Sequence, residues 1–92
     1  MERIDYHPVD TIPVEIAAVA TVVNGAATSV RIWLRSLAVI SSPTTYITDN
    51  DLAQEVVSQA GLNEETEFSA YTLVSSHVLG SQYIYTVDAT VA

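Results

Sequence analysis

The dipeptide Asn24-Gly25 constrains the fold of this chain more than any other feature of its sequence. It lies between two runs rich in β-branched and small apolar residues, Val14–Val23 and Ala26–Ile40. Both central positions of a type I′ turn need positive φ, which Asn and Gly adopt readily, so Asn-Gly between apolar runs is a strong hairpin signal. The sequence therefore predicts a long β-hairpin over residues 14–40.

Residues 51–61 are the one segment with the apolar spacing of an amphipathic helix. The apolar stripe consists of Leu52, Ala53, Val56, Val57 and Ala60. Asp51 is the expected N-cap, with Thr48 or Asp49 as alternatives one turn earlier. Gly61 stands where a left-handed residue would end the helix.

Two further strands are predicted at the end of the chain, over Phe68–Ser76 and Gln82–Val91, with Gly80-Ser81 as the turn between them. Tyr46–Thr48 is either a short strand or an extended link. The predicted fold class is α+β, mostly β. It consists of an antiparallel sheet or small barrel of four to six strands, with one short helix at about 51–61.

Residues 1–13 are predicted to form an extended N-terminal arm, and residues 14–92 a single α+β domain. Pro8 and Pro13 fix φ and favour extended geometry at the residues before them. The arm either leads into the first strand, as an ordered or disordered segment, or reaches a neighbouring subunit.

Targeting signals are not expected in this sequence. It has no apolar run near the roughly 20 residues of a membrane span. Of the five charged residues among its first fifteen, four are acidic, whereas a signal peptide begins with basic residues. We therefore expect no signal peptide or transmembrane segment, and a location in a virion or in the cytoplasm.

Charge and residue types exclude several function classes. The chain has 92 residues, no cysteine, no lysine and a formal net charge of −8. This acidic net charge argues against binding to nucleic acids and to anionic membranes, because both kinds of binding need Lys and Arg. Asp49-Asn50-Asp51 lacks the later ligands of a calcium loop, and His77 lacks the surroundings of a catalytic histidine. We expect no enzyme activity, no cofactor and no metal ligand.

Arg31, Trp33 and Arg35 are the most informative polar and aromatic group, because alternation places all three on one face of one strand. Either they form an outer sheet face with salt bridges inside the chain and a partly buried Trp33, or they form an interface, where Arg and Trp are enriched. The tyrosines of the last strand would fit equally well in a partly hydrated interface or in the core. The candidate interface residues are Tyr6, His7, Arg31, Trp33, Arg35, Tyr83 and Tyr85.

The composition favours protein–protein packing. Apolar residues make up 49% of the chain and charged residues 15%, and a domain this small buries only about 60% of the surface that its unfolded chain exposes. Large exposed apolar patches usually mark contacts. In size and in its Ala/Val/Thr/Ser-rich composition the chain resembles small virion proteins, such as phage capsid decoration or head–tail subunits.

The expected function is therefore that of a non-enzymatic structural or assembly protein, a homo-oligomer or a subunit bound to a capsid or tail lattice. The alternative is a small acidic module that binds one basic protein partner. The two differ in that a module acts as a monomer or dimer, whereas an assembly protein forms larger particles or joins a lattice.

Overall fold

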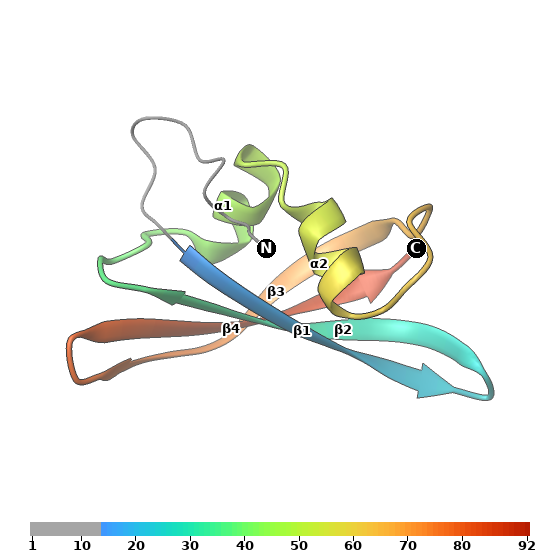
Figure 1. The fold of residues 1–92 in the computed structure, drawn as a ribbon, viewed down its shortest axis with the longest axis horizontal. Coiled ribbons are helices and arrows are strands. Elements are labelled where there is room, and N and C mark those ends of the chain that lie inside the picture. The colour runs from blue at the N-terminus through green and yellow to red at the C-terminus, as the bar shows by residue number, and fades with distance from the viewer. Residues whose placement is uncertain (1–13) are drawn as a thin grey trace.

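The computed structural model describes residues 14–92, which form one four-stranded antiparallel sheet and two short helices (Figure 1). The elements in chain order are β1 (Val14–Val23), β2 (Ala26–Ser36), α1 (Pro43–Asp49), α2 (Ala53–Gln59), β3 (Phe68–Leu79) and β4 (Gln82–Val91). The strand order is β1-β2-β4-β3, so the described sheet is open, with β1 and β3 at its edges. The α+β, mostly β prediction is confirmed. The predicted arm lies outside the described residues.

The hairpin prediction is confirmed for β1 and β2, although the strand pairing ends at Ser36. Asn24 and Gly25 join the strands with φ of 52° and 82°, the left-handed values that a type I′ turn requires. Gly80, with φ of 63°, begins the turn between β3 and β4. Because β2 also pairs with β4, the two hairpins lie side by side in one sheet.

The helix predicted at about 51–61 is confirmed as α2, but the chain forms a second helix, α1, over the residues expected to be a strand or a link. Pro43 stands in the first turn of α1, where its missing N–H costs no hydrogen bond. Ile47 is completely buried beneath α1. Pro43 is buried as well, so burial of these two side chains favours a helix where local propensity left the conformation open.

Asp51 does not cap α2, contrary to expectation. Its φ is 56°, so it forms a left-handed link between the helices, and Leu52 takes the N-cap position without a side-chain hydrogen bond. Gly61 does end α2 in the left-handed conformation, with φ of 71°. The N–H of Leu62 donates to the carbonyl of Val57 at 3.0 Å, which is the bond of a Schellman motif.

The core lies between the helices and one face of the sheet. Helix α2 packs against β1, while α1 contacts β3 and β4, and both helices lie on the same side (Figure 1). The most deeply buried side chains are Val14, Val30, Ile32, Leu34, Ile47, Leu52, Val56, Val57 and Val87. Within residues 14–92, no element covers the opposite face, which we call the open face.

Candidate functional site

Strand register places the predicted trio Arg31, Trp33 and Arg35 on the open face. Paired residues of antiparallel strands project to the same side of the sheet, and Ile32 and Leu34, the alternate residues of β2, are buried on the helix side. Three rows of paired residues therefore cross the open face. They are Glu15–Arg35–Ile84–His77, Ala17–Trp33–Thr86–Ser75 and Val19–Arg31–Asp88–Thr72.

Both arginines of the open face form ion pairs with carboxylates of neighbouring strands. The Arg31 guanidinium donates from Nε and an Nη atom to the two oxygens of Asp88, at 2.8 and 2.9 Å. The hydrogen bond from Arg31 lowers the pKa of the Asp88 carboxyl below its ordinary value. Arg35 pairs with Glu15. Of the alternatives that the sequence left open, both arginines thus form salt bridges inside the chain, and the charges of the open face cancel.

Trp33 lies half-buried in the middle row, between the two ion pairs. Its partner Thr86 is only 7% exposed, although no described element covers this face, so neighbouring side chains shield it. A hollow of about 400 Å³ is lined by Trp33, Ile84, Ala17, Arg35, Glu15 and Ile16. The open face thus presents an aromatic and aliphatic centre flanked by balanced charges.

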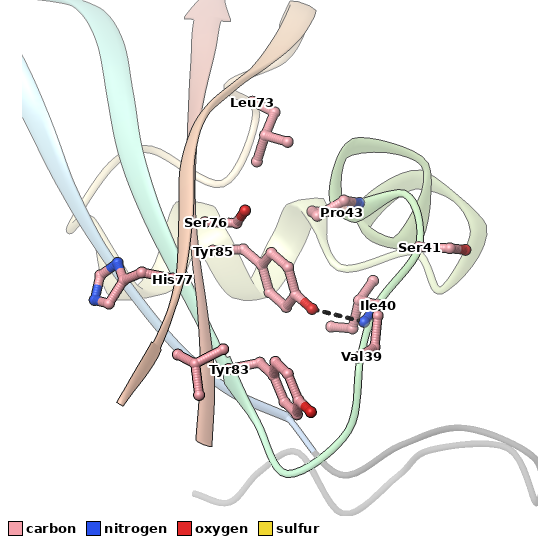
Figure 2. A pocket seen from close by; sticks show the side chains of 10 residues that line it. Val39, Ile40, Ser41, Pro43, Leu73, Ser76, His77, Tyr83 and Tyr85 are labelled. Carbon is pink, nitrogen blue, oxygen red and sulfur yellow. Dashed lines mark hydrogen bonds between the residues drawn. The ribbon is translucent and has the colours of Figure 1, made fainter. Parts of the chain in front are cut away.

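Tyr83 and Tyr85 project to the helix side, away from the trio. Tyr85 is 6% exposed, and its hydroxyl accepts a hydrogen bond of 2.8 Å from the buried N–H of Ile40 (Figure 2). Tyr83 is half-buried and lines a separate groove beside β3. The five candidate interface residues within 14–92 therefore lie on two opposite sides of the sheet. Tyr6 and His7 lie outside the described residues.

Sequence reasoning did not single out the residues that surround the trio on the open face, among them Glu15, Asp88, Ile84 and Thr86. Alternation within β4 places Ile84, Thr86 and Asp88 on the same face of that strand. The missing information was the register between strands, which pairs Arg31 with Asp88 across 57 positions of sequence. No local pattern carries that pairing.

The described residues offer little for acid–base or metal chemistry. Ser76 and His77 both line the groove beside β3, but the imidazole of His77 is directed to the other side of the strand (Figure 2), and no hydrogen bond joins it to Ser75 or Ser76 within residues 14–92. In the same range, no three histidine or acidic side chains are placed to hold a metal ion. Nor does any helix there have the length and apolarity needed to cross a membrane.

Comparison of the chain with protein-family models, with curated proteins and with solved structures finds no match.

Proposed function

We propose that this chain is a non-enzymatic assembly protein that packs through its open face against copies of itself or against a larger protein lattice. The observation that carries the proposal is an uncovered sheet face centred on Trp33, with both of its arginines already neutralised. Tryptophan and arginine are the residue types that most often dominate binding energy at protein interfaces.

The size of the open face supports the proposal. Four strands spaced about 4.8 Å apart, with ten residues at about 3.4 Å each, give a flat area of roughly 600 Å². A standard interface buries about 800 Å² per partner, and projecting side chains bring the open face close to that value. It is thus large enough for one specific protein contact.

Charge distribution also favours the open face over the helix side. The four strands carry two arginines and two carboxylates, whereas the segment 37–67 carries six carboxylates and no Lys or Arg. Two copies that meet through their helix sides would bring like charges together, which is unfavourable. Contact through the neutral open faces avoids this repulsion and keeps the acidic side in water.

The deciding experiment measures particle mass by light scattering over a hundredfold concentration range, at low and high salt. We expect oligomers for the native chain and a shift toward monomer for Trp33→Ala. Tyr46→Ala is the matched control, since it truncates a half-buried aromatic residue of α1 that packs on the helix-side core, and it should leave association unchanged.

Monomers at every concentration would contradict self-assembly through this face. The lattice form of the proposal then has its own test, which is capture of a partner by the native chain and loss of capture by Trp33→Ala. Virion proteins are the lattice that the composition favours. Equal capture by the native chain and by Trp33→Ala would contradict the use of the open face altogether.

A second candidate function is an acidic module for a basic protein partner. The gathering of six carboxylates in residues 49–67, with no basic residue between them, favours it. This candidate predicts a chain that does not associate with itself, and binding that weakens steeply with salt. Insensitivity of partner binding to salt would count against it.

A further inference from the structure

Strand β3 is an edge strand with few of the features that normally protect a sheet edge. It runs for 12 residues, Phe68–Leu79, and its partner in the described sheet is β4 alone. It contains no Asp, Glu, Lys, Arg, Pro or Gly. Natural edges are usually short, charged or interrupted by proline, because their free N–H and C=O groups pair readily with another strand. Of these devices β3 has only register irregularities, one between Phe68 and Ala70 and one between Leu73 and Ser75.

Much of β3 is also exposed, including four of its large apolar side chains. Residues 72–79 are all exposed, and Leu73, Val74, Val78 and Leu79 are between 44% and 63% accessible. On the helix side, a groove of about 370 Å³ runs along this strand (Figure 2). Its apolar lining includes Val39, Pro43, Leu73, Val78 and Tyr83. A strand added at β3 would place alternate side chains over this groove and cover it.

We propose that the β3 edge pairs with the β3 edge of a second copy of this chain, antiparallel about a two-fold axis, to form one continuous eight-stranded sheet. The contact uses backbone groups of an edge, so it is a surface separate from the open face, and it does not rest on the function proposed above.

Two arguments indicate that the strand added at β3 is β3 of a second copy. One rests on charge and the other on whether the assembly ends after two copies. Two chains of net charge −8 repel each other, and an uncharged strand lets them approach without opposing carboxylates. The other described edge, β1, carries Glu15. Pairing of β3 with β1 of another copy would leave a free edge at each end and grow into a fibre, whereas pairing of β3 with itself closes after two copies.

The expected contact is modest in size. Twelve residues span about 40 Å and a sheet layer is about 10 Å thick, so the edge of β3 would bury roughly 400 Å² on each copy. Contacts in the groove add to this area. The total of about 800 to 1,000 Å² falls at the low end of specific interfaces. A dimer whose population depends on protein concentration is therefore expected.

The test compares Val74→Lys with the native chain by sedimentation velocity across concentrations. Lysine at the centre of β3 faces its own copy near the two-fold axis, so we expect the dimer dissociation constant to rise at least tenfold. Val22→Lys is the matched control, because it adds the same charge at an exposed valine near the end of β1, and it should dimerise like the native chain.

A second measurement uses the native chain alone, so it does not depend on whether Val74→Lys folds. The rate of amide hydrogen exchange in β3 should be lower in concentrated than in dilute protein. Unchanged β3 protection, or equal dimerisation of Val74→Lys and the native chain, would overturn the proposal. Fibres in place of dimers would show that β3 pairs with β1 instead, which also overturns it.

The open-face proposal and the β3-edge proposal can each be contradicted without affecting the other. Trp33→Ala should leave the concentration-dependent protection of β3 intact, because Trp33 lies on β2 and on the open face. Val74→Lys should leave any association through the open face intact. A chain that loses protection of β3 with Trp33→Ala, and not with Val74→Lys, would contradict the edge contact while supporting the face contact.

Discussion

Replacement of Tyr85 by phenylalanine tests whether one buried hydrogen bond holds the segment between β2 and α1 on the sheet. The Tyr85 hydroxyl accepts the N–H of Ile40 at 2.8 Å, and both residues are at most 6% exposed. Ile40 belongs to the apolar core and lines the groove beside β3. Phenylalanine keeps the ring and removes the acceptor, so the Ile40 N–H is left buried without a partner.

The expected cost follows from that unpaired donor. A buried polar group without a partner costs about 1–3 kcal/mol, and local adjustment of the exposed residues 37–39 favours the lower part of that range. We expect the free energy of unfolding to fall by about 1–2 kcal/mol. For a domain of this size, this corresponds to a decrease in Tm of about 4–16 °C.

The assay is urea unfolding of Tyr85→Phe beside Tyr83→Phe, followed by amide exchange at Ile40. Tyr83 is a half-buried tyrosine of the same strand and same face, and loss of its hydroxyl should change stability by less than about 0.5 kcal/mol. Faster exchange at Ile40 is expected for Tyr85→Phe alone. Equal stability of the two variants, with unchanged exchange at Ile40, would refute the reasoning.

Two further variants test backbone geometry and charge. Gly61→Ala should lower the free energy of unfolding by about 1 kcal/mol, because φ of 71° is strained for alanine. The added methyl group itself would meet no atom within 4 Å. Thermal unfolding measures the effect, and unchanged stability would contradict a left-handed residue at the end of α2. Asp88→Asn should be less stable than the native chain at pH 7. Since the pKa of folded Asp88 lies below its unfolded value, this advantage should be present above about pH 4 and vanish as pH falls through the folded pKa. The effect should be small because the carboxylate is 39% exposed, and a difference that persists unchanged to pH 2 would argue against the ion pair.

The features that the sequence predicted correctly depend on residues close together in the chain. Asn24-Gly25 sets the turn of the first hairpin and Gly61 ends α2, because positive φ is accessible to these residues and costly to most others. Alternation assigned Arg31, Trp33 and Arg35 to one face of β2. These preferences act over a few residues, so they can be recognised before any tertiary contact is known.

The conformation of residues 43–51 and the register between distant strands were determined only by tertiary contacts. Helix α1 is stabilised by burial of Pro43 and Ile47. Asp51 adopts a left-handed conformation in the link between the two helices, which lie on one face of the sheet. Register between distant strands joined Arg31 to Asp88 and separated Trp33 from Tyr85 by the thickness of the sheet. A shift of one residue would exchange the two faces of a strand, so long-range burial, and not local propensity, determines which side chains form the open face.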